Sequence, residues 1–124
     1  MFSHIMVGTN DLDRAKSFYD SVLGTLGVPP ARVDGHRIFY MTPSGIFSVS
    51  KPIDGKPATI ANGGTIGFAA ASPAQADAWH AAGVAAGGTS IEDPPGVREG
   101  SAGKLYLAYL RDPDGNKICA LHRM

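Results

Sequence analysis

The sequence has a single cysteine, no excess of charge of either sign and no long apolar run, and each absence excludes a class of protein. Because Cys119 is the only cysteine of the 124 residues, the chain cannot form an internal disulfide or a cysteine-rich zinc module. Its 11 basic and 11 acidic side chains balance, so we expect no nucleic-acid partner and no attraction to anionic lipid. No apolar stretch approaches the roughly 18 residues that a membrane-spanning helix needs, and no membrane association is expected.

The length and the apolar content are those of one packed domain. A chain of 124 residues with 44% hydrophobic residues can bury a core of its own. The 16 glycines and 9 prolines indicate many turns but fall short of a disordered composition. The first residues show no secretion signal, and with one cysteine a reduced, cytoplasmic setting is the simplest expectation.

The chain repeats itself at an offset of 61 residues. Residues 3–7 and residues 64–68 each alternate apolar and other side chains, which predicts a strand in both places. Asp11 and Ser72 are each placed to cap a following helix, and Pro73 suits a first helical position. Four pairs of positions share the offset: His4 with Thr65, Asp11 with Ser72, Phe18 with Trp79 and Gly27 with Gly88.

Short β-type segments follow each expected helix. They cover residues 32–34, 36–42 and 46–50 in the first half and 89–92, 105–111 and 116–122 in the second. The second half has a Pro- and Gly-rich insertion, residues 93–103, which we expect to be a loop. The run Asp112-Pro113-Asp114-Gly115 lacks the later ligands of a calcium loop and is interpreted as a plain turn. Both halves therefore read βαβββ.

Three short motifs, two near the start of the chain and one near its end, carry a family resemblance. They are His4-Ile5-Met6-Val7, then Asp11-Leu12-Asp13-Arg14-Ala15-Lys16-Ser17-Phe18-Tyr19 with Val22-Leu23-Gly24, and Asp112-Pro113-Asp114-Gly115-Asn116-Lys117-Ile118. With them the whole chain resembles the vicinal oxygen chelate (VOC) superfamily of glyoxalase I, bleomycin- and fosfomycin-resistance proteins and extradiol dioxygenases. The superfamily hosts lyases, epimerases, thiol transferases, dioxygenases and drug-binding proteins, so the motifs mark the fold more than the chemistry.

The resemblance implies an α+β fold in one glyoxalase/bleomycin-resistance-like domain, residues 1–124. Two βαβββ modules, residues 1–52 and 64–124, would be joined by a linker over residues 53–63. Their strands would form concave mixed sheets, or half-barrels, with the helices on the convex side. Related two-module chains often pair, so the resemblance also implies a homodimer.

Strand alternation separates a face covered by the helices from an inward face. The positions expected under the helices are Ile5, Val7, Phe47, Val49, Ile66, Phe68, Ile118 and Ala120. The inward positions are expected to line a pocket for a small-molecule ligand: His4, Met6, Phe39, Met41, Ser48, Ser50, Thr65, Tyr109, Arg111, Cys119 and Leu121.

The resemblance also implies four metal-ligand positions, one in the first and one in the last strand of each module, usually occupied by His, Glu or Gln. In this chain they are His4, Ser48, Thr65 and Cys119, and only His4 keeps a ligand of the usual type. Neutral hydroxyls bind Zn²⁺, Ni²⁺ or Fe²⁺ poorly, and the thiol is either a soft-metal ligand or a plain pocket thiol. We therefore expect no cofactor and no tightly bound metal; a weakly held divalent metal is the alternative.

His4 and Tyr109 are the candidate catalytic residues. His4 is interpreted either as a functional base or as a hydrogen-bonded structural histidine. Tyr109 lies three residues before Asp112, where related resistance enzymes direct an aromatic hydroxyl toward the substrate; an ordinary strand aromatic is the other interpretation. Arg111 is placed either to meet an anionic group or to face solvent.

Two functions stay open at this point. The first is a glyoxalase/bleomycin-resistance-like protein that binds a small organic molecule without a tightly bound catalytic metal. The second is a glyoxalase-like lyase, or a related enzyme, acting on a small oxygenated substrate. It would use either a weakly held metal on His4 and Cys119, or His4 as base and Tyr109 as electrophile. We favour the first because three of the four ligand positions lack the usual residue types.

Overall fold

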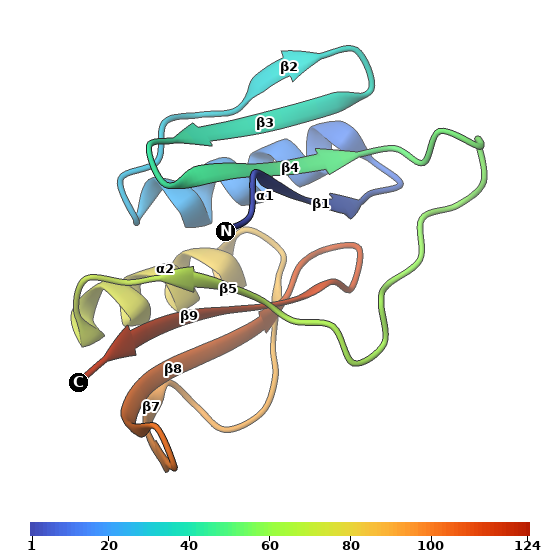
Figure 1. The fold of residues 1–124 in the computed structure, drawn as a ribbon. Coiled ribbons are helices and arrows are strands. Elements are labelled where there is room, and N and C mark those ends of the chain that lie inside the picture. Colours follow the sequence, from blue (N-terminus) through green and yellow to red (C-terminus); the bar gives the residue numbers. More distant parts are fainter.

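The computed structural model describes residues 1–124 and consists of two helices and nine strands (Figure 1). In chain order the elements are β1 (His4–Gly8), α1 (Leu12–Gly24), β2 (Arg32–Asp34), β3 (Arg37–Thr42), β4 (Gly45–Ser50), β5 (Ile66–Ala69), α2 (Pro73–Ala85), β6 (Thr89–Ser90), β7 (Gly96–Gly100), β8 (Gly103–Arg111) and β9 (Lys117–Arg123).

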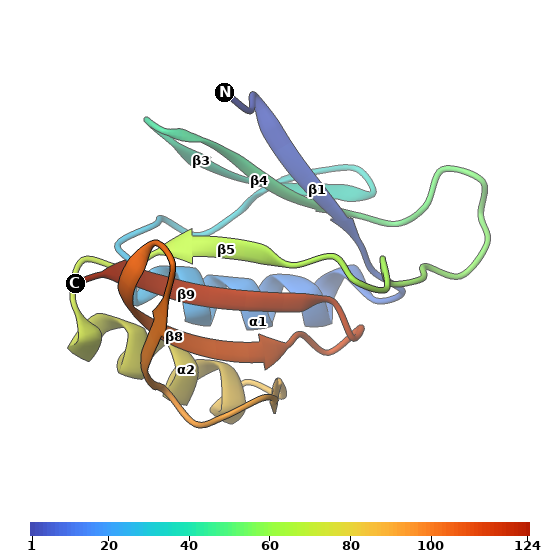
Figure 2. The same ribbon diagram turned by 60° about the horizontal axis from the view of Figure 1, so that its bottom comes forward.

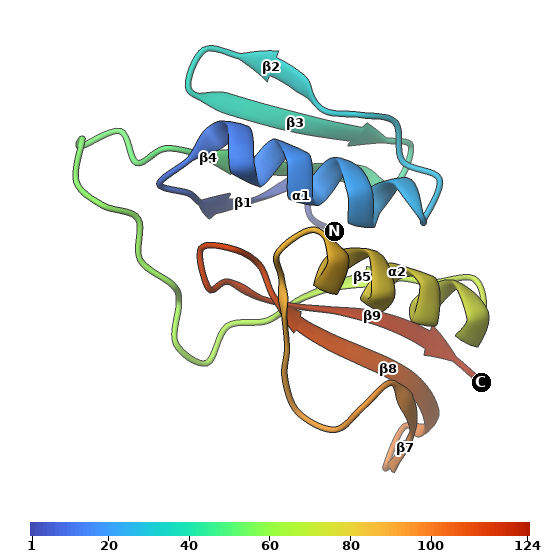
Figure 3. The same cartoon turned by 180° about the vertical axis from the view of Figure 1, so that it is seen from behind.

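The strands form two mixed sheets, one from each half of the chain. The first has the order β1-β4-β3-β2 and the second has the order β5-β9-β8-β6, with β7 paired to β8. In both sheets the first strand of the module is parallel to the last, and the other pairs are antiparallel. Figure 1 shows the sheets side by side with both helices behind them, and Figure 3 shows the same helices from the other side. The predicted α+β fold of two modules with helices on one side is confirmed.

Both helices begin at the caps that the sequence predicts. The Asp11 carboxylate accepts a hydrogen bond from the Arg14 backbone N–H (3.0 Å), and the Ser72 hydroxyl accepts one from the Gln75 N–H (3.1 Å). These bonds satisfy donors that a helix start otherwise leaves free. Pro73 is the first residue of α2 and needs no such partner. Each helix is 13 residues long, and neither has the length and apolarity to cross a lipid bilayer.

One core joins the two modules. A cluster of 16 buried residues draws on α1, α2 and both sheets. Phe47 of β4 meets Phe68 of β5 edge to face, with ring centroids 5.1 Å apart. Seven of the eight positions expected under the helices lie there: Phe47, Val49, Ile118 and Ala120 belong to the cluster, and Val7, Ile66 and Phe68 pack against it. The eighth, Ile5, lies outside the cluster. The fully buried Trp79, which the repeat pairs with Phe18, belongs to the same core.

The second module differs from the prediction in three places. Residues 93–103 are not a plain loop, because they contain β7, which forms an antiparallel hairpin with β8. The Pro and Gly residues around Val97 conceal a short run of extended residues. The segment predicted at 89–92 is a strand only over the two residues of β6, and β5 begins at Ile66, so Thr65 precedes the strand.

The turn between β8 and β9 is more than the plain turn that the sequence indicates. It is closed by a hydrogen bond from the Gly115 N–H to the Asp112 carbonyl (2.9 Å). The Asp114 carboxylate then accepts hydrogen bonds from the Thr9 hydroxyl (2.6 Å) and the Arg14 guanidinium (2.9 Å). Since Thr9 and Arg14 belong to the β1–α1 junction, this turn fastens the second module to the first.

The linker leaves β4, runs outside the sheets and returns to β5 (Figures 1 and 2). It touches the first module through the Ala58 backbone N–H, which donates to the Asn10 side-chain oxygen (2.6 Å). The linker therefore lies against the end of β1, where Ala58 also meets Gly8.

Candidate functional site

A groove of about 570 Å³ lies where the two modules meet. It is bounded by the chain start, β1, the end of α1 with the residues after it, the β3–β4 turn and β5. Thirteen of its 21 lining residues are hydrophobic, so it can shelter an apolar molecule from water. The lining residues are Met1, Phe2, His4, Ile5, Leu23, Leu26, Gly27, Val28, Pro29, Tyr40, Met41, Thr42, Pro43, Ser44, Gly45, Ile46, Phe47, Ile66, Gly67, Phe68 and Ala69.

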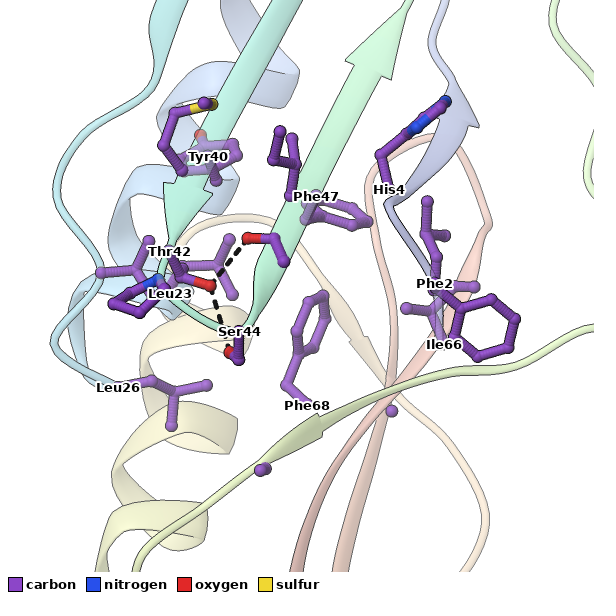
Figure 4. A pocket seen from close by; sticks show the side chains of 18 of the residues that line it. Phe2, His4, Leu23, Leu26, Tyr40, Thr42, Ser44, Phe47, Ile66 and Phe68 are labelled. Atoms are coloured by element: carbon purple, nitrogen blue, oxygen red, sulfur yellow. Dashed lines mark hydrogen bonds between the residues drawn. The ribbon is translucent and has the colours of Figure 1, made fainter.

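Aromatic and aliphatic side chains form the walls (Figure 4). The rings of Phe47 and Phe68 lie in the middle of the view, Leu23 and Leu26 toward α1, and Phe2 beside Ile66 on the opposite side. Phe2 is an aromatic residue that stays 69% exposed while lining the groove. A bound molecule would therefore cover apolar surface that water now contacts.

The polar side chains of the groove are few, and none of them is a Lys, Arg, Asp or Glu. The Thr42 hydroxyl donates to the Gly45 carbonyl (2.7 Å) and lies 3.2 Å from the Ser44 hydroxyl (Figure 4). The Tyr40 hydroxyl donates to the Asp20 carboxylate (2.8 Å), and burial followed by this bond raises the Tyr40 pKa. The Tyr40 hydroxyl therefore stays protonated and already has a partner.

His4 contributes the only imidazole of the groove. Its Nδ1 lies 2.8 Å from the Ser3 hydroxyl, and the residue is exposed. Because the neighbouring hydroxyl engages one ring nitrogen, Nε2 is left to meet solvent or a ligand.

By register the six predicted pocket residues of the first sheet share its helix-free face, and two of them, His4 and Met41, also line the groove. By register Met6 and Phe39 flank Ser48 on that face. Ser48 is buried, and the Ser50 hydroxyl donates to the Lys51 carbonyl (2.7 Å). The two serine hydroxyls are thus withdrawn from the groove.

Four more predicted residues lie together on the second sheet, around the pair formed by Tyr109 and Cys119; Arg111 and Leu121 follow on the same face. Lys117 holds its ammonium 5.0 Å from the centre of the Tyr109 ring and forms an ion pair with Glu92. Burial raises the pKa of Tyr109, so its hydroxyl is protonated at neutral pH. The Arg111 guanidinium donates to the Gly115 carbonyl (2.7 Å) and so holds the β8–β9 turn.

Cys119 is a buried thiol. Burial raises its pKa to about 11. A thiol needs to be deprotonated to act as a nucleophile or a metal ligand, so at neutral pH this side chain acts as a small apolar group.

The four positions at which the resemblance implies metal ligands are divided between the two modules. His4 and Ser48 lie on the first sheet, Cys119 lies on the second, and the exposed Thr65 precedes β5. No group of three or more His, Cys, Asp or Glu side chains in the chain is arranged to hold a metal ion. One imidazole, two neutral hydroxyls and a protonated thiol do not fit a divalent metal. That the four share one hollow stays a prediction.

Sequence reasoning missed much of the groove. Strand alternation assigns Phe47, Ile66 and Phe68 to the helix side, so they were not predicted to line a pocket. In the structure these three residues pack in or against the core and also line the groove. Residues 26–29 and the first two residues lie outside the strands, so no alternation marks them. Phe2, an aromatic residue that precedes the first strand, is the one signal in the sequence that could have indicated this wall.

Three comparisons relate the chain to known proteins. A family model described as Glyoxalase/Bleomycin resistance protein/Dioxygenase superfamily matches residues 1–120. A crystal structure of a glyoxalase/bleomycin resistance protein from Albidiferax ferrireducens T118 is similar with 64% identity and a TM-score of 0.98, over 99% of each chain. None of the curated proteins matches the chain.

More distant solved structures share the fold. A glyoxalase-related enzyme from Fulvimarina pelagi has 18% identity and a TM-score of 0.74, over 99% of this chain and 88% of its own. A lactoylglutathione lyase from Agrobacterium tumefaciens has 22% identity and a TM-score of 0.68, over 98% of this chain and 92% of its own. At these identities the likeness is one of architecture.

Proposed function

Because this chain belongs to the Glyoxalase/Bleomycin resistance protein/Dioxygenase superfamily, we propose that it binds a small organic molecule in the groove between its modules, without a tightly held catalytic metal. The observation that carries the proposal is the groove, since about 570 Å³ of space walled mainly by hydrophobic residues is within the usual size of small-molecule sites. His4 is the polar group best placed to orient such a molecule, because it is exposed at the groove.

The geometry gives less support to an acid–base enzyme that uses His4 and Tyr109. His4 lies on β1 of the first sheet and lines the groove, whereas Tyr109 lies on β8 of the second sheet and does not. General acid–base catalysis requires both groups within hydrogen-bonding reach of one substrate. We therefore do not propose the lyase as the function, and measurements of metal content and turnover test it.

Fragment binding tests the proposal. We expect ligand-observed NMR to find fragments whose affinity falls severalfold in Phe2→Ala and in Met41→Ala, since both side chains line the groove. The matched control is Val97→Ala, another exposed apolar residue that lies on β7, away from the groove. No bound fragment, or equal losses in all three variants, would contradict binding in the groove.

Metal content separates the two candidate functions. We expect elemental analysis of the purified protein to find no stoichiometric metal, and melting curves with added Ni²⁺, Zn²⁺ or Mn²⁺ to stay unchanged. We also expect no turnover of hemithioacetals. A stoichiometric metal that is lost in His4→Ala would instead favour the lyase.

We also propose a homodimer in the cytoplasm. Apart from the family resemblance, support comes from Met6 (42% exposed), an apolar side chain on the helix-free face of the first sheet and outside the groove; an exposed apolar side chain there can pack against a partner. Light scattering should give twice the chain mass, and Met6→Glu should raise the monomer fraction while Val97→Glu does not. A monomeric wild type at micromolar concentration would overturn the dimer.

A further inference from the structure

We propose that the ligand of the groove is uncharged, with an apolar body bound between the modules and a single hydrogen-bonding group directed to His4. This inference rests on the proposed function and adds the class of ligand. It starts from the composition of the groove, whose 21 lining residues include no Lys, Arg, Asp or Glu side chain.

Because the walls contain no Lys, Arg, Asp or Glu side chain, we expect the ligand to carry no net charge. An ion that leaves water loses its hydration, and an apolar cavity returns that free energy only through an opposite charge or several hydrogen bonds. The Asp20 carboxylate lies behind Tyr40, and it is already bonded to Lys16 (2.6 Å) and to the Tyr40 hydroxyl. A carboxylate, phosphate or ammonium ligand would find no Lys, Arg, Asp or Glu side chain in the walls, and the ammonium group of Met1 at the rim is fully exposed to water.

The walls favour a flat apolar body. Phe47 and Phe68 meet edge to face, with an interplanar angle of 83°, so one ring presents its face where the other presents its edge. A third ring, Phe2, is mostly exposed at the side of Ile66 (Figure 4). Aromatic ligands gain from such offset and edge contacts in addition to the area that they bury.

The polar end of the ligand meets few side chains that can still form a hydrogen bond. Among the polar side chains of the groove, those that retain free hydrogen-bonding capacity are the exposed imidazole of His4 on β1 and the exposed hydroxyl of Ser44 in the β3–β4 turn. The hydroxyls of Tyr40 and Thr42 already donate within the protein. A ligand with one neutral hydrogen-bonding group, such as an alcohol or a carbonyl, matches these few free side chains.

Three probes of similar shape test the inference on the wild-type chain by isothermal titration. They are 2-naphthalenemethanol, 2-naphthoate and 2-naphthylmethylammonium, which are neutral, anionic and cationic at pH 7. We expect the neutral alcohol to bind at least about tenfold more tightly than either ion, because neither ion is compensated in the groove. Tighter binding of an ion would overturn the inference and leave the proposed function standing, whereas no binding of any probe would count against both.

A charge introduced into the wall provides the second arm. Ile46, half-buried and paired with both His4 and Met41 across the sheet, lines the groove, so Ile46→Lys should weaken the alcohol and strengthen the anion until their order reverses. Val33→Lys, on the exposed edge strand β2, is the matched control and should leave the order unchanged. Melting curves of both variants verify folding, and an unchanged order in folded Ile46→Lys would place the probes elsewhere and overturn the inference.

The role of His4 has its own measurement. His4→Ala should lower the affinity for 2-naphthalenemethanol severalfold and leave that for 2-methylnaphthalene, which has no hydroxyl, unchanged. An equal loss for both probes would mean that His4 only shapes the groove, and would overturn the hydrogen bond to His4.

Discussion

Gly88, just after α2, lies where the fold leaves no room for a side chain. A Cβ there would lie 2.8 Å from the Phe18 ring, 2.9 Å from the Gly83 carbonyl oxygen and 3.1 Å from the Arg111 carbonyl oxygen. Two of these three neighbours are backbone atoms, which cannot turn aside as a side-chain end can. Close packing therefore requires a glycine at position 88, whereas a Cβ on Gly27, its counterpart in the repeat, would meet nothing within 4 Å.

Gly88→Ala should lower the free energy of unfolding by about 1–3 kcal/mol, the usual cost of overpacking, as measured by urea denaturation. Gly24→Ala is the matched control, because a Cβ on Gly24 meets nothing within 4 Å and alanine favours the helix. The control should be as stable as the wild type or slightly more stable. Equal stability of Gly88→Ala and the wild type would mean that this contact relaxes freely.

The buried thiol of Cys119 makes stability depend on alkaline pH. Burial holds its pKa at about 11, against an ordinary value of 9.0. Between these values the unfolded chain releases the thiol proton and the folded chain keeps it, so the free energy of unfolding falls as the pH rises through this window. Below pH 9 both states keep the proton and the thiol contributes no pH dependence.

We expect the wild type to lose about 1–2 kcal/mol relative to Cys119→Ala between pH 8.5 and pH 10.5, after allowance for partial solvent screening. Both proteins should carry Tyr109→Phe, because Cys119 helps to raise the pKa of Tyr109; subtracting one unfolding curve from the other then removes the titration of the tyrosines that they share. The native thiol should also react slowly with a thiol reagent at pH 8 and rapidly in urea. A parallel pH dependence in the two proteins would contradict the raised pKa.

At the scale of elements, the turn of residues 112–116 connects the two modules. Asp114 is 4% exposed at its side chain and accepts bonds from the Thr9 hydroxyl, the Asn10 N–H and the Arg14 guanidinium. Beside it the buried Asp112 carboxylate accepts the Tyr19 hydroxyl (2.6 Å). A short turn thereby fixes the position of α1.

Asp114→Ala should cost about 2–4 kcal/mol of unfolding free energy, since three donors lose a mostly buried charged partner. Hydrogen exchange should increase at residues 9–14 more than in β8. The control is Asp93→Ala, an exposed carboxylate with no side-chain hydrogen bond. If the two variants were equally stable, the turn would not hold the modules together.

Local patterns predict the elements because they act within a few residues. The caps Asp11 and Ser72 and the alternation in β4 and β9 need only neighbouring atoms, and the structure confirms them. The role of Asp114 could not be predicted, because its partners lie about a hundred positions earlier in the chain. β7 was missed for a different reason: its partner β8 begins only three residues after it, but the Pro and Gly residues around Val97 conceal the extended segment.

At the scale of the molecule, the site was predicted less well than the fold. Alternation sorts side chains into two faces of one sheet, but the groove opens between two sheets and takes residues from the helix-facing side, such as Phe47 and Phe68. Only the way in which the modules pack determines that opening. His4 was predicted as a pocket residue because it lies on β1, where alternation applies, and it lines the groove between the modules.

The shared core predicts that the modules fold as one unit. Phe47 of the first module contacts Phe68 of the second, and Phe68 lies near Trp79, with ring centroids 6.4 Å apart. Val22 of α1 would lie 3.2 Å from a Cβ on Gly83 of α2, so a bare glycine allows the helices to approach closely. Separating the modules would expose these apolar faces to water, at a cost that neither small module can offset alone.

Urea unfolding should therefore be a single transition, with the same midpoint for Trp79 fluorescence, which reports on the second module, and for far-ultraviolet circular dichroism, which reports on both. The fragments 1–63 and 64–124 should each be unfolded when expressed alone, and mixing them should restore helical signal. Two separate midpoints, or a fragment that melts cooperatively by itself, would show that each module is stable without the other. In that case the groove would lie at a mobile boundary, and ligand binding would then narrow the gap between the two midpoints.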